Sequence, residues 1–171
     1  MVGVIFKMNI KIVSILIGII LVGAMLIIPI SIFGSSLIDK YSYYRSESID
    51  LSKESINGVK IGEDFKEIKE NITDLDDKSD DWFTYKKSTN VRVDKKNMVD
   101  SVYSESNNVN TQKQINLNSS RKEIASAYGD KYYKREEQGF KIKGYPDKKL
   151  KINLEFWYLN SKLEKILLVK R

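Results

Sequence analysis

Cysteine and histidine are both missing from the 171 residues. Without cysteine the chain has no disulfide and no thiolate nucleophile, and without either residue type it has no Cys/His zinc site. Without histidine there is no imidazole base, which excludes His-dependent catalytic triads. A glycine-rich phosphate loop is also absent, so nucleotide hydrolysis has no support. We therefore expect a non-catalytic protein with no cofactor and no metal site. An enzyme with an unrecognised active site is the alternative.

Proline occurs only twice, and 42% of the residues are hydrophobic, a composition that argues against a disordered chain. The aspartates of residues 74–81 do not follow the ligand spacing of a calcium loop, so we interpret them as a solvated loop. The formal net charge is +6.

Charge is missing altogether from residues 12–38, and the apolar stretch Ile12–Phe33 spans 22 residues. About 20 such residues suffice to cross a bilayer as a helix. We predict a cytoplasmic tail over residues 1–11 and a transmembrane anchor over residues 12–36, with the C-terminal part extracytoplasmic by the positive-inside rule. Small residues at 34–36 leave a cleaved signal peptide as an alternative. Lys40 and Arg45, just beyond the apolar stretch, keep the reversed topology open.

The chain after this segment divides by composition and by an internal similarity. Residues 37–55, rich in serine, tyrosine and charge, are predicted to be a stalk or linker. Within residues 56–171, the segment IGEDFKEI at 61–68 resembles LNSSRKEI at 117–124. Each can begin with a capped helix, which we place at Asp64–Ile72 and Ser120–Tyr128. The sequence thus predicts repeat one over 57–106 and repeat two over 114–171.

Short strands are predicted after each helix. Leu154, Phe156 and Tyr158 alternate with Glu155 and Trp157, which is typical of a strand with one buried face. The predicted fold class is α+β: a transmembrane helix, then a tandem helix–antiparallel-strand repeat with the helices on one face of the sheet. The predicted strands are Trp82–Lys86, Asn90–Asp94, Met98–Tyr103, Phe140–Ile142, Lys149–Tyr158 and Lys162–Val169.

The same alternation indicates an interaction surface. Trp157 and Glu155 should point to the open face of the sheet, and Arg92, between two valines, should do so in repeat one. A tryptophan beside charges is typical of a protein-binding hot spot. Our hypothesis is therefore that Trp157, Glu155 and Arg92 contact a protein partner.

A basic window offers a second hypothesis. Residues 130–151 hold eight basic and four acidic residues, interleaved with aromatic ones. Outside a membrane, anionic lipid headgroups or acidic wall polymers are suitable partners for such a patch, and we expect no nucleic acid. A solvated charged loop is the alternative. The candidate residues are Lys131, Lys134, Arg135, Lys141, Lys143, Lys148 and Lys149.

Four features of the sequence together resemble a known family. They are an apolar residue followed by Gly or Ser, a short helix with Glu-Ile, the strand Trp82-x-x-Tyr85, and two strands joined by an Asn/Asp-Lys turn. The combination is similar to the tandem repeat of β-lactamase-inhibitor-protein-like domains, and also to the SmpA/OmlA (BamE) lipoprotein module. The resemblance implies an extracytoplasmic, non-catalytic binding module that uses the open face of its sheet. The chain departs from it in lacking cysteine and in having Asn71-Ile72-Thr73 where a closing glycine is usual.

The sequence therefore predicts a membrane-anchored extracytoplasmic module that binds another envelope or secreted protein. A surface-anchored binder or sensor of an anionic lipid or wall polymer is the alternative. The identity of the partner and the oligomeric state do not follow from the sequence.

The predicted topology has a direct test. An impermeant protease added to intact cells should remove a C-terminal tag while a cytoplasmic control protein survives, because the tag should lie outside the cytoplasm. Blotting for the tag measures this. A tag that is cleaved only after lysis would reverse the topology.

Overall fold

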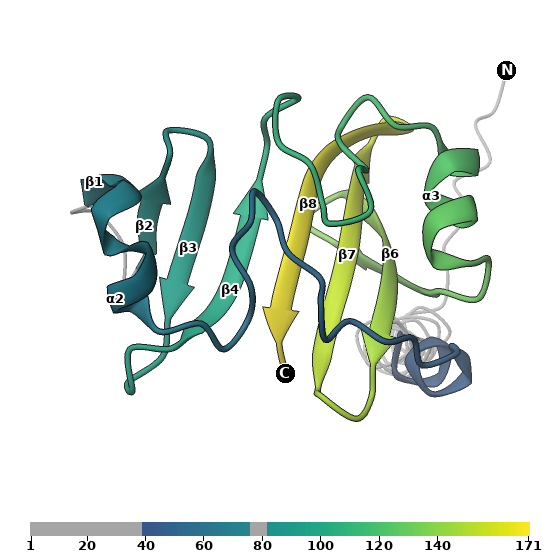
Figure 1. The fold of residues 1–171 in the computed structure, drawn as a ribbon. Helices are drawn as coiled ribbons and strands as arrows, with labels where there is room; N and C mark the ends of the chain where they lie inside the picture. The colour runs from purple at the N-terminus through teal and green to yellow at the C-terminus, as the bar shows by residue number, and fades with distance from the viewer. Residues whose placement is uncertain (1–38, 76–81) are drawn as a thin grey trace, which may run out of the picture. The chain divides into compact units, whose positions relative to one another are not determined.

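One antiparallel sheet dominates the fold. The computed structural model describes residues 39–75 and 82–171, and the sheet lies in the unit Tyr41–Arg171. Its strands follow the order β1-β2-β3-β4-β8-β7-β6-β5 (Figure 1). The strands are β1 (Ile72–Leu75), β2 (Trp82–Tyr85), β3 (Thr89–Val93), β4 (Val99–Ser104), β5 (Tyr133–Glu137), β6 (Phe140–Asp147), β7 (Ile152–Leu159) and β8 (Lys162–Lys170). Because β4 pairs with β8, the first four and the last four strands join into a single sheet.

Two short helices cover one face of this sheet. Helix α2 (Phe65–Ile68) continues into the 3-10 turn η1 (Lys69–Asn71), and α3 (Arg121–Tyr128) precedes β5. A capping box begins α3: the Ser120 hydroxyl accepts from the Glu123 backbone N–H at 3.2 Å, and the Glu123 carboxylate accepts from the Ser120 N–H at 2.6 Å. Side chains of both helices belong to the same hydrophobic cluster as alternate residues of the strands. We call the face that carries this cluster the core face.

An extended segment, residues 46–62, packs against the core face, and we call it the strap. In Figure 1 it crosses the sheet between the helical residues 41–45 and α2. The Ile49 N–H donates to the Pro146 carbonyl at 2.9 Å, and Leu51 is only 2% exposed. Buried Asp147 joins the strap to the β6–β7 turn: one of its oxygens accepts from Leu51 N–H at 3.1 Å. The strap is therefore part of the packed structure.

Several expectations need correction. The predicted α+β class is wrong, because the described residues form mostly an eight-stranded antiparallel sheet with few helices. The helix expected at Asp64–Ile72 ends at Ile68, since the chain instead enters β1, whose Ile72 pairs with Tyr85. The predicted transmembrane segment, residues 12–36, lies outside the described residues. None of the helices in the described ranges is long and apolar enough to cross a membrane.

Other differences concern the ends of elements. β1 and β5, the two edge strands, were not predicted. Leu150, expected in a strand, lies in the β6–β7 turn and is exposed. Of the segment expected to be a linker, residues 37–55, the part from Ser46 onward is held against the sheet. The loop between the two sets of strands is also packed, with Val109 and Ile115 in the core.

Asp147→Ala tests the attachment of the strap. The change leaves the N–H groups of Leu51, Lys149 and Leu150 without their acceptor. We expect a loss of about 2–4 kcal/mol in the free energy of unfolding, measured by urea titration of the full chain in detergent. Asp50→Ala, which removes one exposed hydrogen bond to Ser52 N–H, should cost under about 0.5 kcal/mol. Equal losses in the two variants would contradict this role of Asp147.

Candidate functional site

The face opposite the core face carries an unusual set of aromatic and charged side chains, and we call it the open face. Strand register identifies its members, because directly paired residues in antiparallel strands share a face. Trp82 pairs with Arg92, and Arg92 pairs with Ser101. In the other half, Trp157 pairs with Ile142 and with Lys165. Arg135 pairs with Ile142, which places it on the same face.

A buried carboxylate organises the β5–β7 part of this face. Glu155 is 2% exposed and accepts from four groups. Arg135 donates from Nε at 3.1 Å and from Nη2 at 2.7 Å, and Trp157 Nε1 donates at 3.0 Å. The fourth donor is the Tyr133 hydroxyl. Burial, followed by the charge of Glu155, raises the pKa of Tyr133, so the phenol keeps the proton that it donates.

Gly144 lies in β6 between these partners. The ring of Tyr133 covers it so closely that a Cβ at position 144 would overlap the ring. Glycine is thus required at this point for the Tyr133 hydroxyl to reach Glu155 across β6. Arg135 also forms an ion pair with Glu137 of its own strand. Both carboxylates of this group therefore share Arg135 as their cationic partner within the fold.

Cations and aromatic rings alternate above this layer. Arg135 Cζ lies 5.1 Å from the ring centre of Trp157, and Lys165 Nζ lies 4.9 Å from the same ring. Lys165 is also 5.1 Å from the Tyr103 ring. In the other half, Arg92 Cζ lies 5.4 Å from the Trp82 ring, whose centre is 5.0 Å from that of Tyr103. Such contacts hold the long cationic side chains over the rings.

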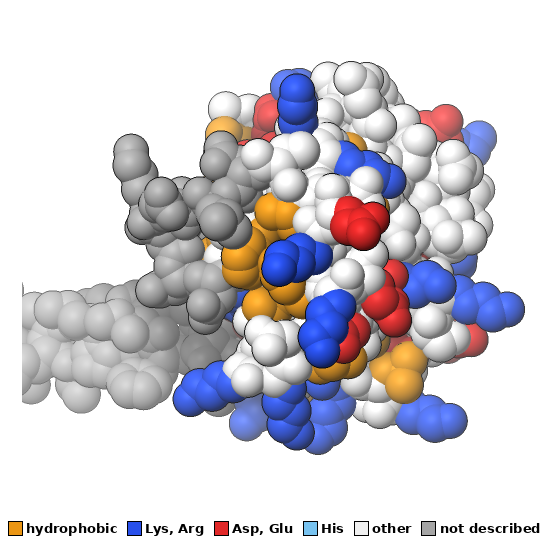
Figure 2. Space-filling model, turned by 60° about the vertical axis from the view of Figure 1, so that its left-hand side comes forward, with side chains coloured by type: hydrophobic (Ala, Val, Ile, Leu, Met, Phe, Trp, Pro, Cys, Tyr) orange, Lys and Arg blue, Asp and Glu red, His pale blue; other side chains and the backbone are white. Residues whose placement is uncertain are grey.

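These side chains line one hollow of about 390 Å³ on the open face. Figure 2, turned so that the β1 edge comes forward, looks onto this edge of the sheet and not into the hollow, and it shows a hydrophobic patch with Lys and Arg side chains beside it. Trp157 is only 7% exposed because Arg135 and Lys165 lie over its ring. The rings of Trp82, Tyr103 and Phe140 are half-buried and form the accessible aromatic surface.

The three predicted interaction residues therefore come together. Trp157, Glu155 and Arg92 all line this hollow. Their environments differ from the expected exposed tryptophan: Glu155 and Trp157 form its floor, whereas Arg92 is partly exposed and bonded to Asp100 at 2.8 Å. Sequence reasoning missed Trp82, Tyr103 and Lys165 as members of the site. Their signal was available, since each occupies an open-face position of a strand that was predicted.

The seven residues of the predicted anionic-partner patch do not form one surface. Arg135 lies on the open face and is bonded to Glu155. Lys134 and Lys143 instead occupy directly opposite positions of β5 and β6 and point toward the core face. Lys131 forms an ion pair with Glu47 at 2.8 Å. Lys148 donates to the carbonyls of residues 44 and 46 in the chain that leads into the strap. Lys141 and Lys149 are exposed.

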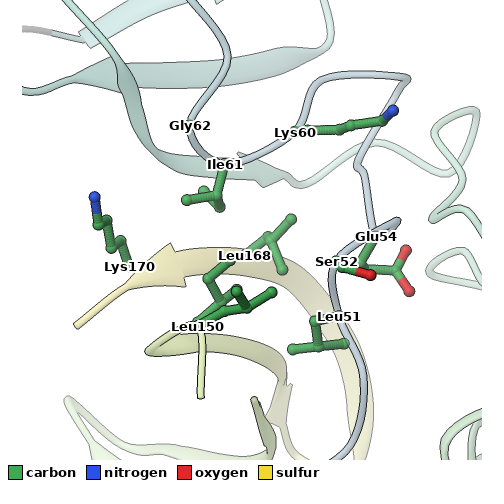
Figure 3. Close-up of a pocket in the computed structure, with 10 residues that line it drawn as sticks. Leu51, Ser52, Glu54, Lys60, Ile61, Gly62, Leu150, Leu168 and Lys170 are labelled. Carbon is green, nitrogen blue, oxygen red and sulfur yellow. The ribbon is translucent and has the colours of Figure 1, made fainter. Parts of the chain in front are cut away.

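A second hollow, of about 310 Å³, lies between the strap and β8. Figure 3 shows Leu51, Ile61, Leu150 and Leu168 converging on it, with Lys170 at one end and Lys60 at the other. Glu54 at its border is bonded, since one oxygen accepts from Gln112 N–H at 2.8 Å and the other from the Tyr128 hydroxyl at 3.0 Å. Its lining continues the hydrophobic core, and none of its buried side-chain polar atoms lacks a hydrogen-bond partner.

Comparison of the chain with protein-family models, with curated proteins and with solved structures finds no match. Among the described residues, no group of three or more Asp and Glu side chains could hold a metal ion. The acidic residues 76–81 lie outside the described ranges. The candidate site is thus defined by its own geometry: a rigid floor of bonded charges beneath half-exposed rings.

Arg135→Met tests the floor of the hollow. The change leaves Glu155 buried without its cation, so the free energy of unfolding should fall by about 3–5 kcal/mol in urea titrations. Adding Glu155→Leu to this variant should recover at least half of the loss, because a buried pair removed as a unit leaves no uncompensated charge. Lys134→Met, on the same strand but exposed on the opposite face, is the matched control and should change stability by under about 0.5 kcal/mol. A double variant no more stable than Arg135→Met would refute this account.

Proposed function

We propose that this chain is a non-catalytic binding module that engages another envelope or secreted protein through the open face of its sheet. The observation that carries the proposal is the hollow in which Trp82 and Tyr103 stand half-exposed above a floor of mutually bonded charges, with the half-buried ring of Phe140 packed against Trp157 beside it. Large rings of this kind dominate the energy of protein–protein contacts when a partner removes them from water.

The floor supports the proposal in a second way. Glu155 and Arg135 satisfy each other inside the fold, so a partner does not have to desolvate an unpaired charge there. Lys165 and Arg92 are held over neighbouring rings, which reduces the side-chain entropy lost when a partner docks. The absence of histidine and cysteine from the sequence is the reason that we propose binding without catalysis.

The proposal includes attachment to a membrane, with the C-terminal unit outside the cytoplasm. Its support is the uncharged segment of residues 12–38 and the lysines that precede it. We also propose a relationship to the β-lactamase-inhibitor-protein-like modules. The order of elements supports this: α2 is followed by β1–β4, and α3 by β5–β8.

Site-directed photo-crosslinking in cells tests the open face. The full chain would carry p-benzoylphenylalanine in place of Tyr103 at the hollow or in place of Tyr44, which is 66% exposed and outside the hollow. We expect a light-dependent adduct with a single protein from position 103 and not from position 44. The cross-linked partner would be measured by blotting and identified by mass spectrometry.

Two alanine substitutions in the cross-linking chain complete this test. Trp82→Ala in the position-103 chain should reduce the adduct about tenfold or more, as expected for a hot-spot ring. Tyr44→Ala removes a more exposed ring away from the hollow and should leave the adduct unchanged. Equal cross-linking from both positions, or an adduct insensitive to Trp82→Ala, would count against the open face as the binding surface.

A further inference from the structure

Three cations and two tyrosines meet on the core side of β5 and β6, beside the start of α3. Lys134 and Lys143 face each other in the register of these strands. Lys143 Nζ lies 4.3 Å and Lys134 Nζ 5.8 Å from the ring centre of Tyr132. Arg121, the first residue of α3, lies with its Cζ 5.1 Å from the ring centre of Tyr158. We call these five residues the tyrosine–cation cluster.

The positive charges of this cluster act together. A hydrogen bond from Lys143, and the charges of Lys143, Lys134 and Arg121, lower the pKa of Tyr132 in spite of its partial burial. Within residues 39–75 and 82–171, none of the three cations forms an ion pair. Positive charge therefore converges on one place that the described residues do not neutralise.

Tyr158 supplies a second and independent observation. Its side chain is 5% exposed, and its hydroxyl is the one buried side-chain polar atom in the described ranges without a hydrogen-bond partner. Burial raises the pKa of Tyr158 to about 12, although Arg121 opposes the shift, so the phenol keeps a proton to donate. A buried donor without an acceptor costs free energy, so such groups are rare, and a bound ion is one of the partners that can satisfy them.

We propose that the tyrosine–cation cluster binds a phosphate group, to which the three cations and the Tyr158 hydroxyl donate hydrogen bonds. A phosphate monoester carries close to two negative charges and three strong acceptor oxygens, which suits three cations better than a single carboxylate does. Arg121 contributes a planar group with several donors, and the two lysines contribute mobile point charges. The site lies on the opposite side of β5 from Arg135 and does not depend on the proposed function of the open face.

The sequence window of basic residues contained only part of this site. Lys134 and Lys143 belong to the predicted patch, but Arg121 lies outside it, and Tyr158 was assigned to the core. Alternation along β5 and β6 separates Lys134 and Lys143 from Arg135, and the packing of α3 brings Arg121 to them. The remaining basic residues of the patch either have other partners or are solvent-exposed.

Calorimetric titration of the full chain in a maltoside detergent tests the proposal, with inorganic phosphate as the first probe. We expect saturable binding that chloride at the same ionic strength does not reproduce. Arg121→Gln and Lys143→Gln should each weaken binding about tenfold, the value of one charged hydrogen bond. Titration with phosphate that gives no more heat than chloride would overturn the proposal.

Two variants separate a defined site from a diffuse positive surface. Lys122→Gln is the matched control, because it removes one exposed charge from the neighbouring position of the same helix, and it should weaken binding less than twofold. Tyr158→Phe keeps the ring and should weaken binding about fivefold or more, while the thermal midpoint of the free protein stays the same or rises because an unpaired donor is removed. Equal effects of Lys122→Gln and Arg121→Gln, or no effect of Tyr158→Phe on binding, would overturn the site as described.

A second probe distinguishes the sources of the phosphate group. Glycerol 3-phosphate carries the same group as an ester, as lipid headgroups and phosphate-containing polymers do. Tighter binding of the ester than of inorganic phosphate supports the site and assigns it to an esterified phosphate. Tighter binding of inorganic phosphate supports the site with the free anion as its ligand.

Discussion

The buried carboxylate of Glu155 is the constraint on which the β5–β7 half of the sheet depends. A carboxylate that is 2% exposed is stable only when its oxygens are fully bonded to donors and its charge is matched. Those donors come from β5 and β7, with β6 between them. β5 is an edge strand of mostly charged residues, and a shift of one residue would turn Arg135 away from Glu155. The ion pair thus specifies the register of a strand whose own sequence specifies it weakly.

The same register determines both candidate sites. With Arg135 fixed over Trp157 on the open face, alternation places Lys134 on the other face, opposite Lys143. One face of β5 therefore completes the floor of the aromatic hollow, and the other face supplies part of the tyrosine–cation cluster. Gly144 permits this arrangement, since a side chain at that position would displace Tyr133 from Glu155.

Sequence patterns predicted the centre of the fold better than its edges. The alternation from Leu154 to Tyr158 located β7 and indicated correctly which residues point away from the core, because a half-buried strand imposes period two on its side chains. β5 has no such apolar period, and tertiary bonds rather than local preference make it a strand. The strap was unpredictable for a similar reason: buried hydrogen bonds to Asp147 and contacts of Lys148, distant in sequence, hold its serine-rich start. Helix α2 was predicted too long because the pairing of Ile72 with Tyr85 competes with helix continuation.

The position of Trp157 illustrates how a correct face can still mislead about exposure. Alternation assigns a side chain to one side of the sheet, but it says nothing of what neighbouring strands place over it. Here Lys165 from β8 and Arg135 from β5 cover the ring, so the tryptophan becomes part of a rigid floor while Trp82 and Tyr103 remain accessible. A partner on the open face and an anion on the core side would both act on β5, which has a neighbour on one side only. Because adjacent residues of one strand point to opposite faces, the single register of β5 places Lys134 toward the core side and Arg135 toward the open face.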